Sequence, residues 1–485
     1  MHVVVVGAGI TGLAAALTLA DGGAEVTVLE AAPEVGGMLR TSTFAGRRVD
    51  EGADAFLIRT PAALDLATRA GLTDLVHPRA REARVWHDGA LRPLPPHVMG
   101  VPLDVDAVAA TGLLSPAGVD RLRADLTDPA TPLPDGDVSV AEAIGGRLGP
   151  EALARLVDPL VAGINAGDTA RQSLAAVVPQ LDAARRDPGH ASLIASCRAA
   201  AVRARAATAT GPGARSSASP SAPTSSVAGP AAPPDTPPVF AAPADGIDAL
   251  PAAVAAAARA TGRVTIRTGS GVAAVEPDGV VLDDGGRVAS DGVVLAVPGH
   301  RAGPLVGAVD PEAGRLLDGI DHVSVAFVRL AVAPSQVDLP ERASGVLVPR
   351  DAGMETTACS FASTKWARLD PARGDGTLVL RAALGRDGGP DVTALDDLDL
   401  VATVVDDLRR VVGLRGDPVE WSVHRWRRAF PQYRPGHLDR VAAAEASLAE
   451  RVPTVRLAGM YLRGVGIPAS VASGRDAAAA LLAAG

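Results

Sequence analysis

The chain has 485 residues, a net charge of −9 and hydrophobic side chains at 47% of its positions, which is enough for two or more domains with full cores. Its acidic balance, without long blocks of one sign, argues against nucleic acid as a partner and is a poor match for anionic lipid surfaces. Two distant cysteines, no signal-peptide pattern and no apolar run of membrane-spanning length predict a cytoplasmic protein without disulfides or a transmembrane segment, although peripheral membrane contact stays open.

The first thirty residues predict a strand, a turn, a helix and a second strand. Val3 to Val6 is a β-branched run typical of a buried parallel strand. Leu13 to Ala20 is rich in Ala and Leu and favours a helix, which Gly22-Gly23 ends. Glu25 to Glu30 then alternates as a second strand.

The turn between the first strand and the helix carries a GxGxxG pattern, Gly7-Ala8-Gly9-Ile10-Thr11-Gly12. Gly7 permits a tight turn, Gly9 lets the backbone approach a pyrophosphate, and Gly12 allows close packing of helix on strand. The free N–H groups and the positive end of the helix suit the phosphates. Glu30, eighteen residues after Gly12, is positioned to accept the ribose hydroxyls and disfavours a 2′-phosphate. A plain turn without ligand would leave Glu30 unexplained, so a dinucleotide site is predicted.

Two further segments favour FAD over NAD. Gly36-Gly37, followed by Arg40 and the run from Glu51 to Phe56, lets the chain pass the pyrophosphate a second time, as a longer cofactor requires. Near the other end of the chain, Gly464 to Pro468 precedes Ser473-Gly474 and a helix, whose N-terminus is suited to negative charge on a reduced flavin.

The middle of the chain changes composition twice. Residues 94–206 predict several short helices. Residues 207–238 are dominated by Ala, Pro, Ser, Thr and Gly, and predict a disordered surface insertion with no role of its own.

Strand patterns return in the second half. The first four strand patterns are separated by Gly/Asp turns and predict a small meander and a returning strand. More strands, a helix and a final strand–loop–helix unit follow them. The predicted elements are strands at Val264–Ile266, Gly271–Val275, Val280–Leu282, Val293–Val297, Val323–Leu330, Gly345–Val348 and Thr377–Leu380, a helix at Leu398–Val412, a strand at Val455–Ala458, a Gly-rich loop at Gly459–Ala469 and a helix at Val471–Ala484.

With these motifs the sequence resembles the bacterial oxygen-dependent coproporphyrinogen III and protoporphyrinogen oxidases, flavin enzymes of late haem biosynthesis. Apart from the insertion, the resemblance covers nearly the whole chain. Its more specific parts are Pro431-Gln432-Tyr433 and the Gly466-Ile467-Pro468 loop. The other matching segments are Val28–Ala31, Gly36-Gly37, Glu51–Leu57, Leu94-Pro95, Val98–Pro102, Pro159–Ile164, Arg425-Trp426, Gly436-His437 and Ser473–Arg475.

The pattern and the resemblance together imply an α/β fold. We expect a discontinuous Rossmann-like FAD-binding domain and a mixed-sheet substrate-binding domain with a helical subdomain. The predicted division is 1–93, 239–310 and 425–485 for the FAD-binding domain, 94–206 for the helical subdomain, 207–238 for the disordered insertion and 311–424 for the substrate-binding domain.

The resemblance also implies which residues bind FAD. Val272 is expected to face the adenine, and Val465, Gly466 and Ile467 are expected beside the flavin. There are two departures from the family pattern: Met38 replaces a basic residue, and Ala458-Gly459-Met460 lacks an acid for the ribityl chain. The full set of expected cofactor contacts is Gly7, Ala8, Gly9, Ile10, Thr11, Gly12, Glu30, Ala31, Gly36, Gly37, Arg40, Gly52, Ala53, Asp54, Ala55, Val272, Val465, Gly466 and Ile467.

The implied reaction is a six-electron oxidation of a porphyrinogen in three rounds, each passing a hydride to flavin N5, with O2 reoxidising the flavin to give H2O2. Coproporphyrinogen III is the preferred substrate and protoporphyrinogen IX the alternative, with a ferrochelatase as a transient partner. Arg59 and Arg463 are candidates for the substrate carboxylates, although each equally suits a solvated surface arginine. No catalytic side chain is assigned, since the flavin carries the chemistry, and no metal-ligand spacing is present.

Several alternatives stay open. A flavin amine oxidase or a carotenoid desaturase shares the terminal motifs but lacks the Pro431-Gln432-Tyr433 region, and a porphyrin-binding flavoprotein would have kept the fold without turnover. Trp426 and Tyr433 either line the pocket or pack beneath the C-terminal segment. His437 is more consistent with a hydrogen-bonded structural histidine than with a catalytic one.

Overall fold

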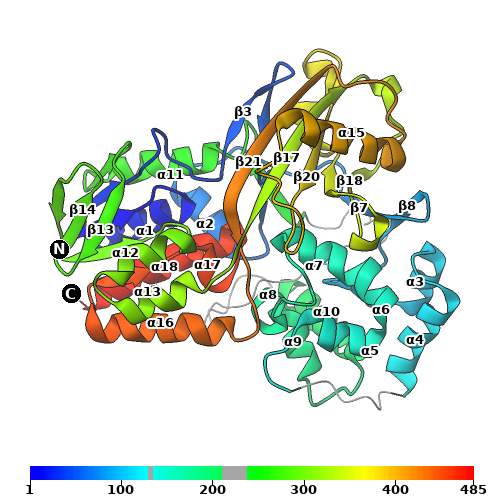
Figure 1. The fold of residues 1–485 in the computed structure, drawn as a ribbon, viewed down its shortest axis with the longest axis horizontal. Coiled ribbons are helices and arrows are strands. Elements are labelled where there is room, and N and C mark those ends of the chain that lie inside the picture. Colours follow the sequence, from blue (N-terminus) through cyan, green and yellow to red (C-terminus); the bar gives the residue numbers. More distant parts are fainter. Residues whose placement is uncertain (129–134, 210–237, 485) are drawn as a thin grey trace.

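A computed structural model describes residues 1–128, 135–209 and 238–484 of the chain. A five-stranded sheet with its helices forms one end of the molecule, and a seven-stranded sheet and a group of helices form the other (Figure 1). The predicted insertion at 207–238 lies outside the described residues except at its two ends, where residues 207–209 continue a helix and residue 238 precedes a strand.

All five strands of the first sheet are parallel, in the order β12-β2-β1-β16-β22. The central strand comes from the first residues of the chain and the edge strand β22 from the last thirty-one, so both chain ends build this sheet. This confirms the predicted strand–helix–strand unit at the start of the chain, and the predicted strand and helix of the unit at its end. The strands are β1 (His2–Val6), β2 (Glu25–Leu29), β12 (Val264–Arg267), β16 (Gly292–Leu295) and β22 (Val455–Leu457).

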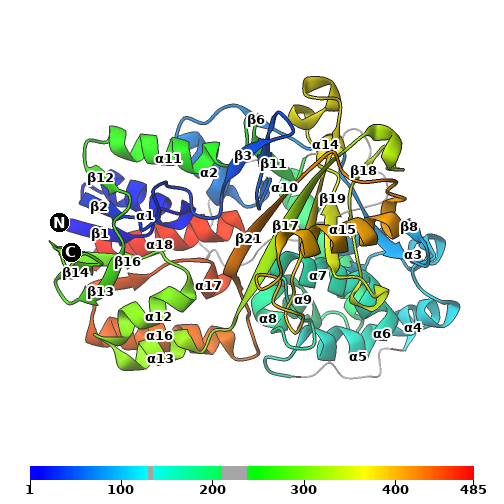
Figure 2. The same cartoon turned by 45° about the horizontal axis from the view of Figure 1, so that its top comes forward.

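Alternation along β1 gives this sheet a core on each face. Val3 and Val5 pack into one cluster, while Val4 and Val6 pack into another. The first cluster lies under α1 (Ile10–Asp21), α2 (Pro61–Arg69), α11 (Ala249–Ala260) and α18 (Ile467–Ala484). The second lies under α12 (Gly299–Gly307), α13 (Pro311–Asp318), α16 (His437–Arg451) and the meander β13 (Val272–Glu276), β14 (Gly279–Leu282) and β15 (Arg287–Ala289) (Figure 2).

The second sheet is mixed, because β18 pairs with β7 in parallel whereas the other strands pair antiparallel. Helix α15 (Asp397–Val412) covers one of its faces. Its strands, in spatial order, are β21 (Glu420–Pro431), β17 (His322–Val332), β20 (Leu378–Leu384), β19 (Thr356–Ser360), β18 (Ala343–Leu347), β7 (Glu82–His87) and β8 (Ala90–Pro93). The α/β fold with a mixed second sheet is as predicted.

The group of helices beside the seven-stranded sheet has a core of its own (Figure 1). Two of the segments are π-helical turns, at Ala141–Gly145 and Leu153–Val157. The α-helices are α3 (Val105–Thr111), α4 (Pro116–Thr127), α5 (Gly146–Leu148), α6 (Pro150–Ala152), α7 (Asp158–Asn165), α8 (Leu174–Val177), α9 (Pro179–Arg185) and α10 (Leu193–Ala209). Smaller elements are β3 (Thr41–Phe44), β4 (Arg47–Asp50), β5 (Phe56–Leu57), β6 (Leu75–Val76), β9 (His97–Val98), β10 (Val101–Pro102), β11 (Phe240–Pro243), α14 (Ala362–Lys365) and α17 (Met460–Arg463).

The structure differs from the sequence predictions at two places. The predicted division is the first: β7, β8 and the part of β21 after residue 424, which it placed in the FAD-binding domain, belong to the seven-stranded sheet, whereas α13, which it placed in the substrate-binding domain, packs on the five-stranded sheet. The predicted loop at 459–469 contains α17, and α18 begins at Ile467 rather than Val471, because a proline at the second helical position is compatible with a helix start. Within the described residues, no helix is both long and apolar enough to cross a membrane.

Candidate functional site

The glycine turn after β1 has the geometry that its pattern predicts. Gly7 has φ +103°, and a Cβ there would lie 2.6 Å from the carbonyl oxygen of Ala296. A Cβ on Gly12 would overlap the carbonyl oxygen of Gly7, so Gly12 allows α1 to approach the strand. In contrast, apart from its chain neighbours, no atom of the described residues lies within 4 Å of a Cβ built on Gly9. Gly9 therefore leaves open space beside the backbone, where a ligand can approach.

Helix α1 presents its N-terminus to this open space. No side chain caps it at Gly9, and its first turn carries no acidic residue. The first N–H groups of the helix and its positive end therefore have no competing side-chain anion. Such an end binds phosphate groups without further basic residues.

Glu30 is held at the end of β2 by two backbone donors. Its Oε2 accepts a hydrogen bond from Ala8 N at 2.7 Å, and its Oε1 accepts one from Ala32 N at 2.9 Å. The carboxylate is thus oriented beside the glycine turn with lone pairs left for hydroxyl donors. Its expected contact with the ribose stays a prediction that this placement favours.

The second glycine pair lies directly against the first. Gly36 N donates to Ala8 O at 2.8 Å, and a Cβ on Gly37 would lie 3.3 Å from the Cα of Gly9. Both residues have positive φ, +113° and +59°. The two turns together form one continuous backbone surface. Such a surface is expected if the chain approaches the diphosphate of the cofactor at both turns.

The last helix closes the site from the other end of the chain. A Cβ on Gly474 would overlap the carbonyl oxygen of Thr11, so α18 and α1 pack backbone to backbone. The N-terminus of α18 lies at Ile467, and its first turn contains no acidic residue. The predicted meeting of the two chain ends is confirmed.

A cavity of about 540 Å³ runs between these elements. Three buried polar atoms of its lining have no hydrogen-bond partner among the described residues: His300 Nδ1, His322 Nε2 and the Tyr461 hydroxyl. Orphaned polar atoms in a cavity wall are expected where a polar ligand binds. The open space beside Gly9 and these atoms fit a long dinucleotide cofactor.

Most of the predicted cofactor residues line this cavity. Arg40 Nε donates to the Gly37 carbonyl at 3.1 Å, so this side chain fixes the second glycine turn. Ala8 and Gly12 act within the first turn, and Asp54, Ala55, Arg40 and Gly466 also lie outside the lining. The predicted residues that do line it are Gly7, Gly9, Ile10, Thr11, Glu30, Ala31, Gly36, Gly37, Gly52, Ala53, Val272, Val465 and Ile467.

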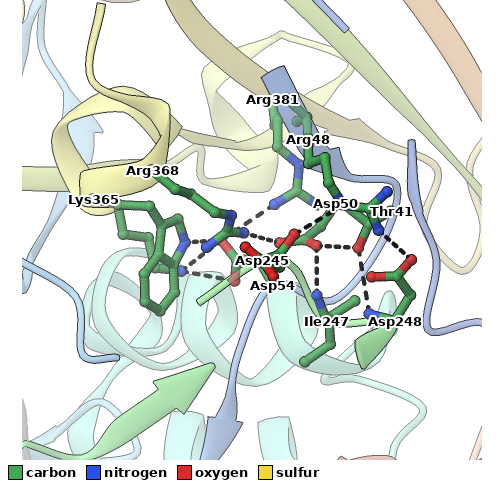
Figure 3. A network of polar contacts seen from close by, with 12 residues as sticks. Thr41, Arg48, Asp50, Asp54, Asp245, Ile247, Asp248, Lys365, Arg368 and Arg381 are labelled. Atoms are coloured by element: carbon green, nitrogen blue, oxygen red, sulfur yellow. Dashed lines mark hydrogen bonds and ion pairs between the residues drawn. The ribbon is translucent and has the colours of Figure 1, made fainter. Parts of the chain in front are cut away.

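Asp54 lies outside the cavity lining and forms ion pairs with Lys365 and Arg381 (Figure 3). Both of its oxygens lie 2.9 Å from Lys365 Nζ, and Arg381 Nη1 and Trp366 Nε1 lie at 3.2 and 3.0 Å. Burial alone would raise the pKa of Asp54, but the charges of Lys365 and Arg381 hold it well below its usual value. Arg381 also donates to the carbonyl of Gly52. Asp54 therefore holds the loop that lines the cavity, and the sole lysine is its ion-pair partner.

Trp426 and Tyr433 were each expected either to line the pocket or to pack beneath the C-terminal segment, and the structure places one in each position. Trp426 lines the cavity and donates to Glu51 O at 3.3 Å, next to Gly52. Tyr433 is buried beneath the C-terminal segment, where its hydroxyl donates to Met460 O and accepts from Gly464 N at 2.8 Å. His437 stacks on Tyr433 at 4.1 Å, and its Nε2 lies 2.9 Å from Leu462 O. His437 is thus a hydrogen-bonded buried side chain beneath the same loop.

Tyr433→Phe should therefore loosen the loop from Met460 to Gly464. It leaves the Gly464 N–H and the Met460 carbonyl without their partner, so we expect a loss of about 1–3 kcal/mol in the free energy of unfolding. Chemical denaturation measures this loss, and faster proteolysis within residues 460–466 would localise it. An unchanged midpoint with an unchanged m-value would contradict the role of the hydroxyl.

The two predicted substrate arginines lie outside the lining of this cavity. Arg463 is exposed and forms an ion pair with Glu445. Arg59 is exposed beyond β5. Their contact with substrate stays a prediction, to which the structure adds no support.

The sequence reading missed part of the cavity lining. Pro298, Gly299, His300 and Arg301 follow β16, and Ser270 precedes β13. Because β16 lies next to β1 in a parallel sheet, its carboxyl end borders the ligand site, and the turn after the predicted strand at 293–297 was a usable signal. Arg427 and Arg428 of β21 also line the cavity, and nothing in their local sequence indicates it.

Comparison with known proteins agrees with this site. The family of flavin containing amine oxidoreductases matches residues 10–482. Coproporphyrinogen III oxidase of Mycobacterium bovis is 36% identical over 97% of this chain and 95% of its own, and that of Bacillus subtilis is 30% identical over 98% and 97%. A solved structure from Exiguobacterium sp. 255-15, whose name assigns it provisionally to the protoporphyrinogen oxidases, is similar with a TM-score of 0.82, 27% identity and coverage of 100% and 99%. The chain therefore belongs to the flavin containing amine oxidoreductases, within them to the family of the bacterial coproporphyrinogen III oxidases, and is an FAD-dependent oxidoreductase.

Proposed function

We propose that this protein oxidises coproporphyrinogen III to coproporphyrin III in haem biosynthesis, with O2 as acceptor and H2O2 as product. The near full-length similarity to proteins named coproporphyrinogen III oxidase carries the proposal. The step balances when the porphyrinogen loses six electrons and six hydrogens while three O2 become three H2O2. The bound FAD supplies the two-electron acceptor for each round.

The protein's own residues bind and orient the cofactor in this proposal. Gly9 and the N-terminus of α1 would hold the diphosphate, Glu30 the ribose and Val272 the adenine, because these residues border the cavity. The N-terminus of α18 lies beside Val465 and Ile467 and stabilises negative charge on the ring. Apolar walls, including Phe327 and Phe430, exclude water from the reacting groups.

The test is anaerobic mixing of the FAD-loaded protein with each porphyrinogen. We expect coproporphyrinogen III to bleach the visible flavin absorption, and admitted air to restore it with three equivalents of H2O2 per porphyrin. Steady-state rates on coproporphyrinogen III and protoporphyrinogen IX then measure the preference. A marked preference for protoporphyrinogen IX would reject the substrate assignment.

The same experiment separates the other candidates. Bleaching by amines but by neither porphyrinogen would identify an amine oxidase activity. A porphyrin-binding flavoprotein would bind the porphyrin without bleaching. Each of these results would overturn the proposed reaction while leaving the FAD site intact.

Three further predictions depend on this function. Transient handover of coproporphyrin III to a ferrochelatase follows from the chemistry of the product, and the cytoplasm is the proposed location. The division into FAD-binding, helical and substrate-binding domains also stays a proposal. The two separate sheets and the separate core of the helices support it.

A further inference from the structure

A second, smaller cavity adjoins the cofactor cavity. Phe327 and Phe430 line both of them, so these two rings form the boundary. The smaller cavity lies between α7 and the strands β17, β19 and β20, and its volume is about 50 Å³. That is room for roughly three or four water-sized groups, the size of a short acidic side arm and far too small for a ring system.

Two arginines line this cavity without a carboxylate partner. Among the described residues, no Asp or Glu oxygen lies within 4.0 Å of the guanidinium nitrogens of Arg350 or Arg386. Arg350 donates to the carbonyls of Asp387 at 3.3 Å and Gly167 at 2.8 Å, which leaves its buried Nε without a partner. Arg386 uses one Nη to donate to Met354 O at 2.6 Å, and its other two nitrogens have no partner in the described chain.

The charge around these donors favours an anion. Asp158 is the only acidic residue in the lining, and its Oδ1 already accepts a hydrogen bond from Thr169 at 2.7 Å. Burial raises the pKa of Asp158, and burial together with the charge of Arg350 lowers the pKa of Arg386. Two arginines and one acid give the lining a net positive charge, while Glu355, Asp387 and Asp407 act on these arginines from outside the lining and without an ion pair to either. A ligand carboxylate in the cavity would supply the direct partner that both guanidinium groups lack among the described residues.

We infer that this cavity is a specificity pocket in which Arg350 and Arg386 bind a carboxylate arm of the tetrapyrrole whose ring lies beyond Phe327 and Phe430. The inference rests on the proposed function and adds the residues that decide the substrate. A tetracarboxylate places acidic arms on all four pyrroles, so one arm reaches the pocket in any seating of the ring. A dicarboxylate carries apolar vinyl groups on two pyrroles, and a vinyl group there would leave both cations unpaired.

The test compares binding of the two porphyrin products to the FAD-loaded protein. Coproporphyrin III with four carboxylates and protoporphyrin IX with two are titrated into wild type, Arg350→Gln and Arg386→Gln, with porphyrin fluorescence as the readout. We expect each substitution to lower the affinity for coproporphyrin III by about tenfold or more and the affinity for protoporphyrin IX by less than about threefold. Arg386→Lys keeps the positive charge but lacks the planar guanidinium group, so it should lose less affinity for coproporphyrin III than Arg386→Gln.

Arg410→Gln is the matched control. Arg410 donates to the carbonyls of Ala352 and Gly353 in the same loop, but lies outside both cavities, so its loss should leave both affinities unchanged. If the Gln variants lost affinity for both porphyrins equally, or lost none while binding FAD normally, the pocket would not bind a carboxylate arm. The proposed oxidation would still stand. A wild-type protein that binds neither porphyrin and oxidises neither porphyrinogen would overturn the proposed function itself.

Discussion

Gly9→Val should leave the apoprotein folded and reduce its affinity for FAD by about a hundredfold or more, which corresponds to about 2.7 kcal/mol. Gly9 has φ −70° and ψ 175°, a conformation open to any residue, and nothing lies within 4 Å of a built Cβ. The new side chain would therefore occupy only the space beside the N-terminus of α1, where the diphosphate is expected. FAD content after purification and titration of the apoprotein with FAD measure the effect.

Two further glycines serve as controls for this prediction. Gly146 has helical dihedrals, and among the described residues no atom outside its own neighbourhood lies within 4 Å of a built Cβ. Gly146→Val should therefore change neither FAD binding nor the fold, because valine is no worse than glycine in a helix. Gly12→Ala should instead lower the stability of the apoprotein, because its Cβ overlaps the carbonyl of Gly7. Normal FAD affinity in Gly9→Val would place the diphosphate elsewhere.

The cofactor half of this site was predictable because its signals are local. Strand β1, the glycine turn and Glu30 lie within thirty consecutive residues. The apolar run, the turn and the acid occur at the spacing of one motif, so each supports the interpretation of the others. The ends of β1, α1 and β2 accordingly shifted by no more than three residues. The C-terminal unit was predicted for the same reason, although the start of α18 required knowing that Pro468 lies inside the helix.

Contacts between distant segments were beyond the sequence pattern. Strand β7 pairs with β18, about 260 residues later, and nothing in Glu82–His87 names that partner. Asp54 lies within a cofactor motif, yet its side chain pairs with Lys365 and Arg381. Arg59 and Arg463 were chosen because they follow motifs, and their role stays a prediction, whereas the shared cavity of Arg350 and Arg386 arises because β18 and β20 belong to one sheet.

Asp54→Leu should be the most destabilising single substitution in the loop from Gly52 to Ala55. It removes the carboxylate that Lys365, Arg381 and Trp366 share, and leaves two largely buried cations uncompensated (Figure 3). Breaking one side of such a pair costs about 3–5 kcal/mol. Because Arg381 also holds the Gly52 carbonyl at the cavity wall, FAD affinity should fall as well. Chemical denaturation of the apoprotein measures the first effect separately from the second.

The pH dependence of stability distinguishes this buried cluster from a surface pair. The pKa of Asp54 is lowered in the folded protein, so its contribution is complete above about pH 5 and is lost as pH falls below its unfolded value of 3.8. Wild type should therefore lose more stability than Asp54→Leu on acidification through that range. Asp21→Leu is the matched control, because its pair with Arg69 is half-exposed and worth at most about 1 kcal/mol. If Asp54→Leu cost no more than Asp21→Leu, and the two pH profiles were parallel, the cation cluster would not be what holds the loop against the cofactor cavity.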